Sequence, residues 1–250
     1  MTKKNKKIIA TLILISSGTL LLQAQTTGLL KYELGINAGA YIYQGDLTPN
    51  PLGSYKTKKI GLGFTGAKIL NSFFSIRGSL LFARLKGDES KYSNPEYRQQ
   101  RNLNFKSPLI ELTGQLVWNP LGRNYSDKGF TPYVFGGGGF SYLKVKRDWS
   151  NLNAEYFGAT STTITGLVTD QQETPPRIIP VLPVGLGVRY NLSSRFAFTA
   201  ESSYRVTFTD YIDGFSYAAN PERNDHYISH TIGLVYRIGK KNTLGCPVVR

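Results

Sequence analysis

The sequence predicts an all-β fold, an eight-stranded antiparallel up-and-down transmembrane β-barrel with short periplasmic turns and long extracellular loops. Three observations lead to this prediction. The chain begins with an export signal, and no later stretch approaches the roughly 18 uncharged apolar residues that a transmembrane helix needs. Side chains alternate in character along many segments, which is the period of a strand. The 16 Tyr and 13 Phe residues are also typical of strands.

The first 24 residues are interpreted as a secretory signal peptide. A basic region precedes an apolar stretch at 8–22, and residue 24 is the small alanine that a signal peptidase prefers. The mature chain is then expected to be a barrel domain over 25–250, with a short periplasmic tail at 240–250. The expected location is the bacterial outer membrane.

The charge of the chain excludes one class of partner once export is accepted. The formal charge is +14, and loss of Lys3, Lys4, Lys6 and Lys7 with the signal peptide leaves +10. No nucleic acid is expected as a partner of an exported protein. The anionic surfaces available to it are outer-membrane lipid, lipopolysaccharide and partner proteins. No cofactor is predicted.

Period-two alternation places the strands in order along the chain. In the segment from 195 to 209, for example, Phe196, Phe198 and Ala200 lie on one face. Strands are predicted at 31–43, 58–69, 73–86, 105–118, 131–145, 179–191, 195–209 and 227–239. Each is at least as long as the roughly 9 to 11 residues of a tilted spanning strand. Connections at 70–72 and 192–194 are short, whereas those at 44–57, 87–104, 146–178 and 210–226 are long and polar.

The two faces of these strands predict which side meets lipid. The polar faces carry mostly Gly, Ser, Thr and Ala, which suit a narrow lumen. Aromatic residues recur at the short-turn end, where membrane proteins place interfacial rings. The predicted periplasmic aromatic girdle consists of Tyr32, Phe74, Trp118, Tyr133, Tyr190, Phe196 and Tyr236.

Charged residues on the polar faces predict an ionic lumen. An arginine turned toward lipid near the midplane would cost roughly 2 to 4 kcal/mol, so these residues are expected to point inward and pair. The predicted ion-pair network consists of Glu33, Arg77, Glu111, Arg189, Glu201 and Arg205. A gated pore is the alternative, and the small strand number argues against it.

Two further patterns could carry chemistry. His226 and His230 lie near Asp225 and Ser229, which leaves a lipid-modifying enzyme open, but their spacing matches no metal site and a hydrolase needs further groups. The run at 136–139 is all glycine, yet no Lys-Ser or Lys-Thr follows it as in a phosphate-binding loop. A bend or close strand contact is the favoured interpretation of these glycines.

Three segments carry a resemblance to a known family. Tyr41-Ile42-Tyr43-Gln44-Gly45-Asp46-Leu47, Gly129-Phe130-Thr131-Pro132-Tyr133-Val134-Phe135-Gly136 and Phe208-Thr209-Asp210-Tyr211-Ile212-Asp213 resemble the PorG-type outer-membrane barrels of Bacteroidota. The resemblance spans most of the mature chain, although Gly214 stands where a second acidic residue is frequent and 146–178 does not align. It implies a non-enzymatic scaffold or anchor of the type IX protein secretion system that contacts a periplasmic ring of protein or lipoprotein subunits.

The expected partner contacts lie on the periplasmic side. They are Arg123, Asp127 and Lys128 in the connection 119–130, and Lys240, Lys241 and Cys246 in the tail. A lone cysteine in an oxidising compartment suggests an intermolecular disulfide or a free thiol. The alternative is an incidental thiol in a tail.

On the outer side, Asp210, Tyr211 and Asp213 form a segment interpreted as a loop cap that closes the rim, in preference to a binding role. Three classes of function remain open from the sequence. They are a secretion-system scaffold, a lipid-modifying enzyme, and a plain structural or adhesion barrel.

Overall fold

The computed structural model describes residues 30–50, 53–220 and 222–239. Residues 31–238 form one compact unit. The predicted signal peptide and the predicted tail at 240–250 lie outside the described residues.

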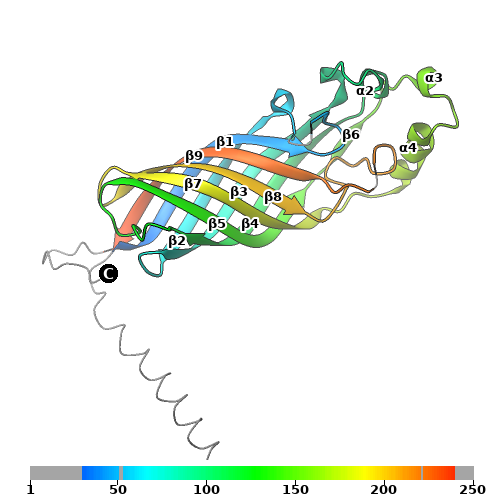
Figure 1. Ribbon diagram of the computed structural model, residues 1–250. Coiled ribbons are helices and arrows are strands. Elements are labelled where there is room, and N and C mark those ends of the chain that lie inside the picture. The colour runs from blue at the N-terminus through cyan, green and yellow to red at the C-terminus, as the bar shows by residue number, and fades with distance from the viewer. Residues whose placement is uncertain (1–29, 51–52, 221, 240–250) are drawn as a thin grey trace, which may run out of the picture. The chain divides into compact units, whose positions relative to one another are not determined.

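Eight long strands make the wall of a closed barrel (Figure 1). They are β1 (Leu30–Gln44), β2 (Lys59–Ile69), β3 (Phe74–Asp88), β4 (Asn104–Trp118), β5 (Gly129–Leu143), β7 (Ile178–Asn191), β8 (Phe196–Thr207) and β9 (His226–Gly239). These bounds lie within two residues of the predicted ones. The sheet runs β3-β2-β1-β9-β8-β7-β5-β4, and β3 pairs with β4 to close it. The predicted fold class is confirmed.

β3 and β4, which close the barrel, form the longest strand pair of the sheet. It runs without a break from Phe74 opposite Trp118 to Asp88 opposite Asn104. Beyond the wall, a short strand β6 (Lys146–Asp148) pairs with the outer end of β4. The sequence does not predict this strand as a separate element, because the alternation indicates one strand that continues to residue 145.

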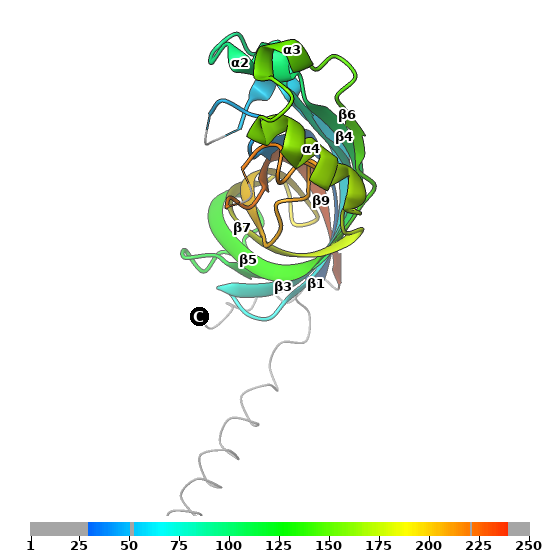
Figure 2. The ribbon, with the colours of Figure 1, turned by 90° about the vertical axis from the view of Figure 1, so that its right-hand side faces the viewer.

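The long loops contain short helices at one end of the barrel, as Figure 2 shows. These are η2 (Tyr55–Thr57), η3 (Glu89–Lys91), α2 (Tyr97–Arg101), α3 (Ala154–Phe157) and α4 (Thr162–Gln172). The loop at 146–178 is therefore partly helical. α4 is tied to the segment before β9, since Asp170 accepts hydrogen bonds from the amides of Ser216, Tyr217 and Ala218 at 2.9–3.2 Å. None of the helices in the described ranges is long and apolar enough to cross a membrane.

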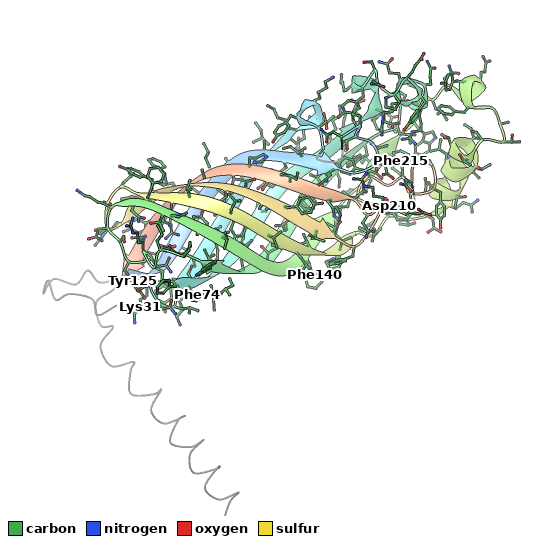
Figure 3. The ribbon with its side chains drawn as sticks, in the orientation of Figure 1. Lys31, Phe74, Tyr125, Phe140, Asp210 and Phe215 are labelled. Atoms are coloured by element: carbon green, nitrogen blue, oxygen red, sulfur yellow. The ribbon has the colours of Figure 1, made fainter. Side chains whose placement is uncertain are left out.

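The outer wall of the barrel is apolar and exposed. Ile60 is 78% exposed and Ile232 is 73% exposed, and Phe140 also faces outward (Figure 3). Soluble monomers rarely leave contiguous apolar patches larger than a few hundred Å² in water. Because such side chains follow one another on all eight wall strands, the wall is built to contact lipid.

The interior has two parts. Toward the long-loop end a buried apolar cluster fills the barrel, with Tyr43, Phe105 and Phe215 among its largest members. Toward the short-turn end the interior is mainly ionic and aromatic. Between β4 and β5 the wall is tight, because a Cβ at Gly137 or Gly139 would collide with a backbone carbonyl of β4. This supports the close-contact interpretation of the glycine run.

Candidate functional site

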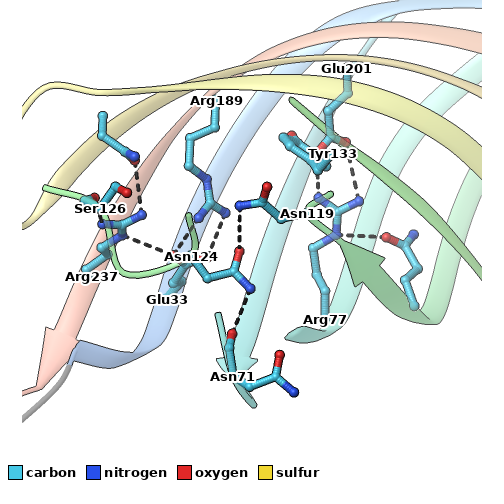
Figure 4. Close-up of polar contacts among 12 residues, drawn as sticks. Glu33, Asn71, Arg77, Asn119, Asn124, Ser126, Tyr133, Arg189, Glu201 and Arg237 are labelled. Carbon is cyan, nitrogen blue, oxygen red and sulfur yellow. Dashed lines mark hydrogen bonds and ion pairs between the residues drawn. The ribbon is translucent and has the colours of Figure 1, made fainter. Parts of the chain in front are cut away.

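The ionic interior begins near the short-turn end with one carboxylate held by two arginines (Figure 4). Arg189 donates from Nη1 and Nη2 to Oε1 and Oε2 of Glu33 at 2.9 and 2.8 Å. Arg237 donates from Nε to Glu33 Oε1 at 3.2 Å and from Nη2 to Asn191 at 3.0 Å. The fork-to-fork contact with Arg189 is the strongest geometry for such a pair. Glu33 therefore links β1 to β7 and β9 across the lumen.

A second cluster lies alongside, centred on Glu201. Its carboxylate pairs with Arg77 and accepts a hydrogen bond from Tyr133 Oη at 2.6 Å. Arg77 also donates from Nε to Gln115 Oε1 at 2.8 Å, and its guanidinium lies 4.5 Å from the ring centroid of Phe135. These contacts join β3, β4, β5 and β8.

A third ionic cluster surrounds Glu111 and borders the apolar core at Tyr227. Arg205 donates from Nε to Glu111 Oε2 at 3.2 Å, and Tyr227 Oη donates to the same oxygen at 2.6 Å. Arg205 also reaches the hydroxyls of Ser203 and Ser229. All six predicted lumen residues thus lie inside and take part in ion pairs.

The lumen leaves little free space. The cavity bordered by Glu33, Arg77 and Glu201 has a volume of about 20 Å³, and a cavity needs about 10–15 Å³ to hold one water molecule. Passage of an ion here would require these ion pairs to separate. The geometry is that of an internal plug and disfavours the pore alternative.

One predicted girdle residue is wrong, and one arginine of the lumen ion pairs was missed. Tyr133 is only 4% exposed and points into the lumen toward Glu201, not to lipid. Aromatic residues occupy both faces of β5, so alternation alone could not separate them, and Phe130 is the exposed ring at the short-turn end of this strand. Arg237 belongs to the Glu33 cluster. Its position on the polar face of β9 was visible in the sequence.

The other six predicted girdle residues face outward at the short-turn end. Phe74 is the cross-strand partner of Trp118, and Phe196 is that of Tyr236. Tyr190 packs against Phe130 with ring centroids 5.1 Å apart. The exposed members are Tyr32, Phe74, Trp118, Tyr190, Phe196 and Tyr236.

The connection between β4 and β5 is the largest of the short-turn loops and is held from within. Asn124 donates from its side chain to Asn71 O at 3.0 Å and from its backbone to Ser72 O at 3.1 Å. Asn119 donates its side-chain amide to Asn124 at 3.3 Å. Arg237 donates from Nη1 to Ser126 O at 2.8 Å. The loop is therefore fixed both to the neighbouring turn and to the ionic lumen.

The predicted partner-contact residues of this loop point the other way. Arg123, Asp127 and Lys128 are all exposed. Lys240, Lys241 and Cys246 lie outside the described residues. In outer-membrane barrels the short-turn end faces the periplasm, so the loop presents three charged side chains to that compartment.

At the opposite end, the segment with Asp210, Tyr211 and Asp213 packs into the barrel mouth. Asp213 is fully buried, and Tyr43 Oη lies 2.6 Å from one carboxylate oxygen of Asp213 and 2.6 Å from one of Asp225. Because the hydroxyl carries one proton, the second contact needs a proton from a carboxyl group. Burial raises the pKa of both Asp213 and Asp225, which favours that protonated form.

This outer segment has the geometry of a loop cap. Asp225 accepts hydrogen bonds from the backbone amides of Ile212 and Asp213 at 3.1 and 3.2 Å. Asp213 in turn accepts from the amide of Phe215 at 2.7 Å. Burial raises the pKa of Asp210 to about 7, and nearby Asp46 adds to the shift.

The two histidines are not brought together with a nucleophile. His226 Nδ1 faces the amide of Thr207 at 3.3 Å, and His230 Nε2 contacts Tyr55 Oη at 2.8 Å. Ser229 points into the lumen toward Arg205. In the part of the chain that the structure describes, no three His, Cys, Asp or Glu side chains are grouped to hold a metal ion.

A closed barrel of eight spanning strands, apolar outside and ionic inside, defines a transmembrane β-barrel of the bacterial outer-membrane class. A family model described as a domain of unknown function, DUF6089, matches residues 6–247. The chain belongs to this family.

Several solved outer-membrane barrels are similar in fold. Neisserial surface protein A is 14% identical, with a TM-score of 0.48 over 83% of this chain and 97% of that one. Ail, the attachment invasion locus protein of Yersinia pestis, is 13% identical, with a TM-score of 0.46 over 85% and 100%. The outer membrane enzyme PagL is 10% identical, with a TM-score of 0.39 over 82% and 99%. At these values the likenesses say nothing about what this chain does. The comparison with curated proteins finds no match.

Proposed function

We propose that this protein is a non-enzymatic outer-membrane anchor that holds a periplasmic partner at the loop between β4 and β5, as a component of the type IX protein secretion system. The observation that carries the proposal is the construction of that loop. Buried Asn119, Asn124 and Arg237 fix its backbone, while three charged side chains remain exposed. A surface that is already ordered loses less entropy on binding.

The plugged lumen supports a role at the surfaces of the barrel. The charged groups of the interior pair with one another across the strands. Such a satisfied network is expected to make the barrel rigid. The histidines and Ser229 face different partners, which favours a scaffold over the lipid-modifying enzyme.

The assignment to type IX secretion rests on the resemblance to PorG-type barrels. Two of the segments that carry it meet in the structure, because Tyr43 of the first contacts Asp213 of the third. The resemblance therefore includes residues that pack against each other at the outer mouth. This contact gives a structural reason for the two segments to occur together.

The decisive experiment deletes the gene in the native bacterium and measures secreted cargo in the medium. We expect deletion to abolish cargo secretion and the wild-type chain to restore it. A variant with Arg123→Glu and Lys128→Glu should insert normally but restore little secretion and lose co-purification of a periplasmic partner. A matched control with Lys144→Glu and Arg177→Glu changes two exposed cations at the opposite end and should restore secretion fully.

Normal cargo secretion by the deletion strain would contradict the proposal. Mass spectrometry of lipid A from the same strains tests the enzyme alternative. A lipid A change that wild type reverses and His226→Ala does not would favour that alternative.

A further inference from the structure

A polar pocket of about 240 Å³ opens at the long-loop end, at the opposite end of the barrel from the loop between β4 and β5. It lies between the loop after β1, helix α2 and the segment that precedes β9. Its polar lining comes from Asp46, Thr48, Arg98, Arg101, Asn220 and Arg223.

The three arginines that line this pocket outnumber its one lining carboxylate, Asp46. Glu89 is fully buried behind the wall and accepts hydrogen bonds from Arg98 Nη1 at 2.9 Å and Arg101 Nη2 at 2.6 Å. One carboxylate thus serves two guanidinium groups. Arg223 is exposed and makes no ion pair with any residue in the described ranges. Counting Asp46 as ionised, these five groups keep a net charge of +1, which favours an anion. Burial raises the pKa of the neighbouring Asp210 and Asp213, which reduces the negative charge that they add.

Two buried polar atoms beneath the pocket surface lack partners among the described residues. Arg98 is nine-tenths buried, and its Nε has no hydrogen-bond partner within the described part of the chain. The same holds for Asp46 Oδ2. Leaving such a group unsatisfied costs about 1–3 kcal/mol. Both atoms are buried beneath the pocket surface, so a ligand contacts the exposed parts of the same two side chains.

The arginine side chains are held in place for a ligand. Arg98 donates from Nη1 to Asp46 O at 2.8 Å, and Arg101 donates from Nη1 to Ala218 O at 3.0 Å. Both guanidinium groups also lie within 6 Å of the ring of Tyr97. Planar guanidinium groups fixed in this way suit the tetrahedral oxygens of a phosphate.

We propose that this pocket binds a phosphomonoester carried by a hydroxyl-bearing molecule of sugar size. The phosphate contacts Arg223 and the Arg98 guanidinium, and a hydroxyl of the same molecule donates to the carboxylate of Asp46, which is half-buried in the pocket lining. The pocket volume of about 240 Å³ accommodates one phosphorylated monosaccharide. A soluble sugar phosphate and a phosphorylated sugar of lipopolysaccharide share this chemistry.

Calorimetry on the detergent-solubilised full chain from outer membranes tests the site, with glucose 6-phosphate, inorganic phosphate and glucose as probes. We expect glucose 6-phosphate to bind with a dissociation constant of about 1 mM or tighter, inorganic phosphate more weakly, and glucose not measurably. Arg223→Gln should weaken glucose 6-phosphate roughly 10- to 100-fold, the effect of losing a hydrogen bond to a charged group. Arg177→Gln, an exposed arginine outside the pocket, should leave the affinity unchanged.

Asp46→Asn tests the hydroxyl contact separately. It should reduce the preference for glucose 6-phosphate over inorganic phosphate, because a neutral acceptor binds the hydroxyl less strongly than a carboxylate. No binding of glucose 6-phosphate to the wild-type chain, or the same affinity in Arg223→Gln, would overturn the proposal. Equal affinities for glucose 6-phosphate and inorganic phosphate would overturn the part of the proposal that concerns the sugar.

The source of the phosphate is distinguished in nanodiscs with and without lipopolysaccharide. Competition by lipopolysaccharide with glucose 6-phosphate would support the site and assign it to the lipid headgroup. Unchanged affinity would support a soluble ligand.

Discussion

Replacing Glu33 by glutamine should destabilise the barrel more than any comparable change on its surface. The wild-type carboxylate is buried and forms ion pairs with both Arg189 and Arg237. Glutamine has nearly the same shape but no charge, so two guanidinium groups would remain in the lumen without a counter-ion. Removing one partner of a buried ion pair costs about 3–5 kcal/mol. Because the glutamine oxygen still accepts one hydrogen bond, we expect a loss of about 3 kcal/mol, at the lower end of that range.

The assay is denaturant unfolding of the barrel in lipid vesicles, followed by the fluorescence of Trp118 and Trp149. Glu155→Gln is the matched control, since Glu155 lies exposed on α3 and surface changes stay within about 0.5 kcal/mol. The double variant Glu33→Gln with Arg189→Met should lose less than the sum of the two single losses, because the two side chains interact.

A second measurement connects this site to the periplasmic loop. Arg237 holds Ser126 O as well as Glu33, so the loss of Glu33 should loosen the 119–128 loop and speed its amide hydrogen exchange. If the Glu33→Gln protein unfolds within about 1 kcal/mol of wild type, well below the cost of an unpaired buried charge, the ion pairs do not stabilise the barrel as argued. Unchanged exchange in the loop would refute the connection between lumen and loop.

Three further outcomes follow from the same structure. Tyr133→Phe should lower the unfolding free energy by about 1–3 kcal/mol, since it leaves Glu201 without one hydrogen bond; no loss would indicate a lipid-facing ring. Leu112→Arg, on the exposed face of β4, should cost about 2–4 kcal/mol in vesicles, and Leu112→Ala, its control, should cost much less. Asp210 has a pKa of about 7 in the folded protein against an ordinary value of 3.8, so the folded state binds more protons between these values and stability should fall as pH rises from about 4 to 7. Asp210→Asn should reduce the slope of that pH profile, to which the raised pKa values of Asp213 and Asp225 also contribute, and a profile identical to wild type would rule out Asp210 as a source.

Alternation was sufficient to predict the wall of the barrel because each strand has one face in lipid and one in the lumen. That contrast places Phe196 outside and Glu201 inside with no knowledge of their neighbours. It failed at Tyr133, where rings stand on both faces of β5 and the deciding contact comes from Glu201 on β8. Pairing between strands distant in sequence cannot be read from either strand alone.

The loops were less predictable for a related reason. The order in the 146–178 loop depends on Asp170, whose carboxylate caps three amides some fifty residues away. Likewise, the arginine pocket exists because Glu89 holds Arg98 and Arg101 from behind. In the sequence these charged residues are scattered through polar loops. Loops have no regular alternation like that of the strands, so nothing distinguishes these residues from their neighbours.

The interior of the barrel differs in chemistry from one end to the other, and this difference limits where function can lie. At the long-loop end, an apolar core and buried carboxylic acids close the mouth as the core of a soluble domain would. At the short-turn end, ionic clusters cross-link strands and leave a cavity too small for more than a water. A solute crossing the barrel would have to disrupt both regions. Within the described residues, the polar side chains available to partners therefore lie beyond the two ends, and they include the charged loop at 119–128 on one side and the arginine pocket on the other.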